Sequence, residues 1–223
     1  MKRFSLAIAL TAGTALALLG SLCLGSVPLS PTEVIGALGA KLFGATRGID
    51  EVTIVIVWQL RLARTLLAGV AGAALGTSGA VLQGLFRNPL ADPYSLGVSS
   101  GASLGAVAAI ALGSKIGLAF PGATEAAAFA GALASAAIVY AVATANRRAA
   151  PTAALLLAGA AVGSFLSAIV SLIVSLNDKD LHTVFFWMLG GFGGKGWADL
   201  ATALPAALIA IVASLFLARP LDI

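Results

Sequence analysis

Two long apolar runs and one short polar turn make up the stretch TLLAGVAGAALGTSGAVLQGLFRNPLADPYSLGVSSGASLGAVAAIAL, residues 65–112. Each run has about 20 residues, the length that an α-helix needs to cross the hydrocarbon core of a membrane. Backbone N–H and C=O groups inside a membrane must be paired within their own segment, which favours helices over open strands. The stretch therefore predicts two membrane-spanning helices joined by a tight turn.

The composition extends this prediction to the whole chain. Of its 223 residues, 60% are hydrophobic and 10% are charged, and its mean hydropathy is +1.04. We predict an all-α bundle of about six membrane-spanning helices in a single domain over residues 1–223. A short helix at the membrane surface is predicted for Pro31–Phe43, because a serine precedes its first proline. The six predicted spans are Leu6–Leu24, Thr65–Leu85, Pro93–Leu112, Thr124–Ala145, Pro151–Leu176 and Ala198–Leu217.

The polar turn carries a strong signal for the start of a helix. Asp92 can accept hydrogen bonds from free backbone N–H groups, and Pro93 suits the first helical position, where no N–H is needed. The third span is therefore expected to begin at Pro93. Asn88 and Pro89 are typical turn residues, so we assign them, with Asp92 and Arg87, to architecture rather than to binding.

Small residues recur at every fourth position in three of the predicted spans. Residues four apart share one face of a helix, and small side chains there let two backbones approach closely in lipid. The alternative is chance, because the chain contains 26 glycines; we favour packing faces. The stripes are Ala68, Gly72, Gly76, Ala80 and Gly84 in the second span, Gly97, Gly101, Gly105, Ala109 and Gly113 in the third, and Gly159, Gly163, Ser167, Ser171 and Ser175 in the fifth.

Hydroxyl groups distinguish the fifth span from the other two. Ser164, Ser167 and Ser171 are spaced by three and four residues, so their hydroxyls fall on one side of the helix. They either bond back to carbonyls of their own helix or line a wet path through the membrane. The chemistry of these residues alone favours bonding within the helix.

The sequence offers no constellation of catalytic or metal-ligating residues. Cys23 and His182 are the only residues of their kinds, and they fall in the first span and in an external loop. We therefore expect no catalytic residue, metal site or cofactor, and an intramembrane enzyme is disfavoured. There is no Walker-type phosphate-binding stretch, so energy must come from another subunit or from a gradient. Basic residues are scattered among short loops, which argues against a nucleic-acid partner.

The orientation of the chain is inferred from its basic residues, which concentrate on the cytoplasmic side of membrane proteins. Lys and Arg are nearly equal in number on the two sides of the predicted bundle. Arg87, Arg147 and Arg148 lie in very short loops on the side of the N-terminus, where the rule carries most weight. We predict a cytoplasmic N-terminus. The basic start and apolar run also fit a cleaved signal peptide, but their length favours a retained span.

Residues 60–106, LRLARTLLAGVAGAALGTSGAVLQGLFRNPLADPYSLGVSSGASLGA, resemble the signature region of the FecCD family. Members of this family are permease subunits of ABC importers for ferric siderophores, haem and cobalamin. The resemblance rests on an arginine pair, an SG followed by a glutamine, NPLADP and LGxxxGA, in that order. Weaker agreement continues through LLLAGAAVGSF, residues 155–165, and WMLGGFGG, residues 187–194.

The resemblance implies a set of partners and a location. These are a second copy of the permease, cytoplasmic ATPase subunits and an external substrate-binding protein, all at a bacterial or archaeal cytoplasmic membrane. It also implies a loop that docks on the ATPase and further spans beyond Ile223. The chain is therefore expected to correspond to the N-terminal two thirds of a family member, lacking the ATPase-docking loop.

The resemblance also assigns roles to particular residues. Arg61 and Arg64 are three apart and are expected to share a helical face before the second span. In the family, arginines at this place resemble those that bind acidic residues of the binding protein, and guanidinium groups suit carboxylates geometrically. The alternative is that they anchor the helix at the interface beside Trp58. The resemblance favours docking, and it makes Ser164, Ser167 and Ser171 candidates for the lining of the passage.

We therefore predict the permease subunit of a binding-protein-dependent ABC importer, with no enzymatic activity of its own. Iron chelates such as ferric siderophores, haem and cobalamin remain open as cargo. The alternative is a secondary transporter driven by an ion gradient. Such transporters typically carry an ionisable residue or a broken helix at mid-membrane, whereas Glu125 and Asp199 lie at the edges of predicted spans.

Overall fold

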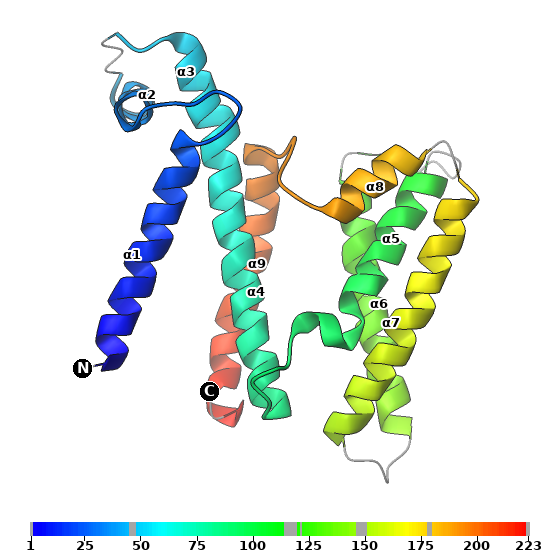
Figure 1. Cartoon of the computed structure of the whole chain (residues 1–223). Helices are drawn as coiled ribbons and strands as arrows, with labels where there is room; N and C mark the ends of the chain where they lie inside the picture. Colours follow the sequence, from blue (N-terminus) through cyan, green and yellow to red (C-terminus); the bar gives the residue numbers. More distant parts are fainter. Residues whose placement is uncertain are drawn as a thin grey trace. The chain divides into compact units, whose positions relative to one another are not determined.

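The computed structural model describes residues 2–44, 48–113, 120, 122–145, 151–177 and 180–221. These residues form helices and connecting turns, without a β-strand among them, which confirms the predicted all-α class (Figure 1). The elements are α1 (Lys2–Cys23), α2 (Pro31–Phe43), α3 (Glu51–Val55), the π-helix η1 (Ile56–Leu62), α4 (Ala63–Phe86), the 3-10 helix η2 (Pro93–Leu96), α5 (Val98–Leu112), α6 (Ala123–Ala145), α7 (Pro151–Ser175), α8 (Leu181–Leu189) and α9 (Trp197–Leu221).

Among the described residues, five helical segments are long and apolar enough to cross a membrane. They are Phe4–Cys23, Glu51–Phe86, Ala123–Ala145, Thr152–Ser175 and Trp197–Leu217. The segment from Glu51 joins α3, η1 and α4 into 36 continuous helical residues. The predicted start at Thr65 was therefore too late, because Arg61 and Arg64 limit the apolar run but do not interrupt the helix.

The prediction of a continuous span over Pro93–Leu112 was wrong. The segment begins with η2, and Gly97 then adopts a left-handed conformation with φ +68°. A left-handed residue ends the local helical ladder, and glycine adopts this conformation without the steric cost that a Cβ brings. The helix α5 starts only at Val98 and has 15 residues, fewer than the ~20 needed to span the hydrocarbon core.

The turn before η2 is held by two side-chain acceptors. The backbone N–H of Leu90 donates to Oδ1 of Asn88 at 2.9 Å, and that of Tyr94 donates to Oδ1 of Asp92 at 2.7 Å. Such turns replace backbone partners with a local side chain. Arg87, at the start of the turn, has a φ of +48°. Arg147 and Arg148, used above for the orientation, lie outside the described residues.

The chain divides into two compact units. Unit 1 contains Met1–Gly76 and Phe192–Phe216, and unit 2 contains Thr77–Gly191 and Leu217–Ile223. The helix from Glu51 to Phe86 passes from the first unit into the second. The single domain inferred from the sequence stays a prediction.

In unit 1, the helix α2 packs across the end of α1 and onto η1. Its first turn has a capping box, in which Ser30 accepts from the Glu33 N–H and the Glu33 carboxylate accepts from the Ser30 N–H. The backbone and then the hydroxyl hydrogen bonds from Ser30 lower the pKa of Glu33 below its ordinary value of 4.5. The core beneath α2 contains Leu22, Leu29, Val34, Ala37 and Val57.

In unit 2, α5 packs against α6 so closely that the two backbones are in contact. A Cβ at Gly101 would overlap the carbonyl of Gly131, and a Cβ at Gly105 would overlap the carbonyl of Ala127. Only glycine fits at these two crossings, which is the close approach that small residues permit between membrane helices. By contrast, a Cβ at Gly72 of α4 would meet nothing within 4 Å.

A further helix occupies part of a segment that the sequence predicted as an external loop. Residues Leu181–Leu189 form α8, with His182 in its first turn. Val184 is the buried residue of this helix, and it packs with Val107 of α5 and Val170 of α7. The loop prediction was wrong because nine residues are too few to show a clear helical period, although LHTVFFWML is strongly apolar.

Candidate functional site

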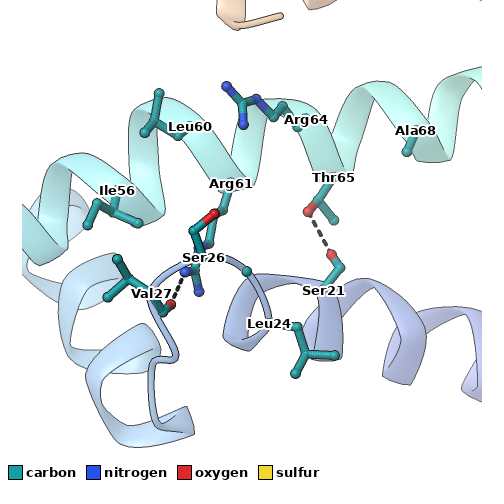
Figure 2. A pocket seen from close by; sticks show the side chains of 11 residues that line it. Ser21, Leu24, Ser26, Val27, Ile56, Leu60, Arg61, Arg64, Thr65 and Ala68 are labelled. Carbon is teal, nitrogen blue, oxygen red and sulfur yellow. Dashed lines mark hydrogen bonds between the residues drawn. The ribbon is translucent and has the colours of Figure 1, made fainter. Parts of the chain in front are cut away.

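Arg61 binds the end of α1 and the segment that follows it. Its Nη1 donates to the carbonyls of Leu22 at 2.8 Å and Cys23 at 3.1 Å, and its Nη2 donates to the carbonyl of Val27 (Figure 2). The last carbonyls of a helix have no partner within the helix, and a cationic donor there also interacts favourably with the helix dipole. Arg61 therefore caps α1 from a neighbouring helix.

The local sequence makes room for this guanidinium. Gly25 has a φ of +156°, which L side chains rarely adopt, and a Cβ there would lie 3.0 Å from Nη2 of Arg61, so glycine suits this close approach. One turn further along, the hydroxyls of Ser21 and Thr65 lie 2.7 Å apart and join α1 to α4 (Figure 2). A cavity of about 510 Å³ lies between these elements and is lined by Arg61, Arg64, both hydroxyl residues and several aliphatic side chains.

Arg64 contacts a different neighbour. Its Nε donates to the carbonyl of Lys195 at 3.3 Å, and its side chain is half-buried. Nearby, the indole N–H of Trp197 donates to the carbonyl of Trp58 at 3.0 Å, with the two ring centroids 5.4 Å apart. These contacts attach the start of α9 to η1. The sequence pointed to Trp58 but missed Trp197.

The guanidinium groups of Arg61 and Arg64 contact different neighbours, although both residues line the same cavity. In Figure 2 the Arg61 side chain extends toward α1 and the Arg64 side chain extends away from it. The π-helix η1 contains Arg61 and ends at Leu62. A π-turn has more residues than an α-turn, so the i,i+3 spacing of an α-helix does not apply across this segment.

The serines of α7 lie beside the broken start of α5. Ser164 and Ser167 are exposed and line a groove of about 640 Å³ together with Tyr94, Gly97 and Ser100. The hydroxyls of Ser100 and Ser167 are 3.1 Å apart. Ser171 instead donates to the carbonyl of Ser167 in its own helix at 3.1 Å. The groove is therefore lined mainly by small side chains, and one pair of hydroxyl groups, those of Ser100 and Ser167, lies within it.

Ser135 of α6 supports this groove from behind. It is 1% exposed, and its hydroxyl donates to the carbonyl of Gly97 at 2.9 Å. On the groove side, a Cβ at Gly97 would lie 3.0 Å from the carbonyl oxygen of Gly159. Sequence reasoning missed Ser135, whose buried hydroxyl needs a partner; the hydroxyl residues Thr124, Tyr140 and Thr144 of the same helix gave no reason to single it out.

The described residues contain no group of three or more His, Cys, Asp or Glu that could hold a metal ion. Cys23 is a free, partly buried thiol. His182 lines a pocket of about 370 Å³ with aliphatic, Met188 and Phe185 side chains. Neither residue belongs to a wider polar cluster in the part of the chain that the structure describes.

Comparison with known proteins places these features in a family. The model of the FecCD transport family matches residues 13–223. The cobalamin import system permease BtuC of Halobacterium salinarum is 44% identical over 181 residues, which cover 79% of this chain and 46% of that protein. The vitamin B12 import system permease BtuC of Klebsiella pneumoniae is 39% identical over 184 residues, covering 82% of this chain and 50% of that protein.

A solved structure has the same fold. It is described as an inward-facing conformation of a metal-chelate type ABC transporter, and it matches with a TM-score of 0.78 and 27% identity. The match covers 98% of this chain and 63% of the solved one. The chain spans about half the length of the curated relatives that it matches.

Proposed function

The chain belongs to the FecCD transport family. From this membership we propose that it forms part of the transmembrane permease of a binding-protein-dependent ABC importer. The observation that carries the proposal is the family match over residues 13–223, joined to five helices of membrane-spanning length. The chain is a multi-pass membrane protein. Its proposed location is the bacterial or archaeal cytoplasmic membrane, with the N-terminus in the cytoplasm.

The proposed assembly contains two copies of the permease, cytoplasmic ATPase subunits and an external binding protein. ATP hydrolysis is assigned to the separate ATPase subunits. The permease supplies the path for the cargo, and this path opens when the two ATPase subunits close on each other. This division is proposed from the resemblance to import permeases.

We propose that the cargo path passes along the exposed side of α7. The groove beside Ser164 and Ser167 supports this proposal, because small hydroxyl side chains give a smooth wall with few specific contacts. Ser171, which bonds within α7, continues the same side of the helix. A bulky cargo passes such a wall without being held by it, since no charged side chain belongs to the groove lining.

Arg64 is proposed to contact carboxylates of the binding protein, while Arg61 positions the surface around it. The contacts of Arg61 with three carbonyls support the positioning role. A charge reversal, Arg64→Glu, is expected to weaken binding-protein affinity more at low salt than at high salt, because exposed charge pairs are screened. Lys41→Glu, at an exposed cation of α2, is the matched control. Equal affinities for wild type and Arg64→Glu at low salt would exclude this contact.

Among the cargo classes, we propose a corrinoid such as cobalamin, because the similar permeases named above import cobalamin. The test is uptake of labelled cobalamin, ferric siderophore and haem by vesicles containing the permease, its ATPase and its binding protein. Cobalamin uptake that stops without ATP is expected. Preferential uptake of a ferric siderophore or haem would overturn the cargo while keeping the importer.

A secondary transporter driven by an ion gradient remains the alternative. The acidic residues at helix starts argue against it: Glu51, Glu125 and Asp199 all lie in first turns rather than at mid-helix. Uptake by the permease alone, driven by a proton or sodium gradient and indifferent to ATP, would favour this alternative and exclude the importer.

A further inference from the structure

The helix α2 is apolar on two opposite sides. One side packs into unit 1 through Val34, Ala37 and Ala40, which are 1–6% exposed. The other side carries Ile35, Leu42 and Phe43, which are 69%, 60% and 83% exposed. Residues at i, i+7 and i+8 lie on one face of an α-helix, so these three form a continuous stripe. We call them the outer stripe of α2.

The outer stripe contains no charged residue. Gly39 lies between its members on the helical wheel and is partly exposed. The connection from α1 adds two further exposed apolar side chains, Leu24 at 76% and Val27 at 47%. This uncharged surface leads directly from the end of a membrane-spanning helix.

The helix lies across the spans of its own unit. In Figure 1, α2 is seen nearly end-on, whereas α1 and α4 run lengthwise. Its two ends are fixed locally, by the capping box at Ser30 and by Gly44, which has a φ of +70°. The 13 residues of α2 therefore form a separate rod at a large angle to the membrane-spanning helices.

The depth of α2 follows from the length of α1. The apolar segment Phe4–Cys23 has 20 residues, and at about 1.5 Å per residue it is as long as the hydrocarbon core is thick, about 30 Å. Its last residue thus lies at the hydrocarbon boundary. Arg61 and the hydrogen bond from Leu29 N–H to the Cys23 carbonyl, 3.2 Å, hold the following segment close to that end.

We propose that the outer stripe of α2 is inserted into the lipid leaflet in which α1 ends, so that α2 is a membrane-interface helix. Helices of this type bury an apolar face about 5–10 Å into the boundary between headgroups and acyl chains. Lipid is favoured over the binding protein as the occupant because the stripe has no charge to pair with carboxylates. The surface is also continuous with the lipid-facing end of α1.

The test measures the environment of a spin label on α2 in the complete protein reconstituted in phosphatidylcholine vesicles. Cys23→Ala removes the single cysteine of residues 1–223, and Ile35→Cys, Phe43→Cys and the matched control Lys41→Cys each carry the label. Oxygen concentrates in lipid and a nickel chelate in water, so their collision rates report depth. We expect an oxygen-to-nickel ratio severalfold higher at Ile35 and Phe43 than at Lys41.

Two results would overturn this proposal. Labels at Ile35 and Phe43 that both collide more often with the nickel chelate than with oxygen would place the stripe in water. Low collision rates with both reagents at these positions mean that protein, such as a second copy, covers the stripe. Leu42→Cys gives an independent reading on the same stripe if one of the other variants fails to fold. None of these outcomes depends on transport, so the proposal stands or falls separately from the importer.

Discussion

Replacing Arg61 by alanine tests whether this residue fixes the end of α1. The substitution removes the donors to the Leu22, Cys23 and Val27 carbonyls. A hydrogen bond to a charged group contributes about 1.5–3 kcal/mol, but water replaces part of it at this half-buried position. We expect Arg61→Ala to lower the free energy of unfolding by about 2–4 kcal/mol.

The assay is a titration with sodium dodecyl sulfate in mild detergent, followed by the loss of helical circular dichroism. The single cysteine supplies a local readout, because Cys23 lies at the site of the lost contacts. Its labelling by a maleimide should become faster in Arg61→Ala. Arg61→Lys keeps the charge but loses the planar fork, so an intermediate effect is expected.

Arg64→Ala is the matched control for this experiment. It removes the 3.3 Å hydrogen bond from Nε to the Lys195 carbonyl, and a loss of about 1 kcal/mol is expected. If Arg61→Ala destabilises the protein no more than Arg64→Ala and leaves Cys23 labelling unchanged, the capping role is refuted.

Three further perturbations test packing and capping elsewhere. Gly105→Ala places a Cβ against the carbonyl of Ala127, and a loss of about 3 kcal/mol is expected in the same titration. Ser135→Ala removes one of two donors to the Gly97 carbonyl, which still accepts from the Gly101 N–H, so a loss of about 0.5–1.5 kcal/mol is expected. The pKa of Glu33 is lowered in the folded protein, so its carboxylate stabilises the start of α2 above pH 4.5, and this stabilisation is lost as the pH falls through the lowered pKa. Backbone hydrogen exchange in α2 should then accelerate.

Each of these perturbations has a control on the same chain. Gly72→Ala should change stability little, because a Cβ there meets nothing within 4 Å; a loss equal to that of Gly105→Ala would contradict the packing. Ser171→Ala removes an exposed hydroxyl and should be nearly neutral, unlike Ser135→Ala. Glu33→Gln should abolish the acid response of α2, and a response that persists in this variant must come from another group.

Features that depend on local residue chemistry could be predicted from the sequence. The apolar runs indicated the long helices, and serine before Pro31 indicated α2. Asn88 and Asp92 lie in turns, and their side chains accept the hydrogen bonds that stabilise these turns. These inferences need only a few neighbouring residues, because capping and span length are local properties.

Features that depend on distant partners could not be predicted. The carbonyls that Arg61 binds lie 34–39 residues away, so its contacts follow from how α1 returns to η1 rather than from LRLAR itself. Gly97 was placed in a helical stripe, although its left-handed conformation is stabilised by the buried hydroxyl of Ser135. A glycine in an apolar run is compatible with both conformations, and only the packing decides between them.

The π-helix η1 sets the rotational phase between the two ends of a 36-residue helix. Each residue of an α-helix turns the chain by about 100°, so adding or removing a single residue rotates everything beyond it by that angle. Val57, fully buried beneath α2, and Trp58, paired with Trp197, both lie inside this wider turn. The number of residues between Ile56 and Leu62 therefore aligns the contacts of Val57 and Trp58 with those of Arg64 and Thr65 in the first turn of α4.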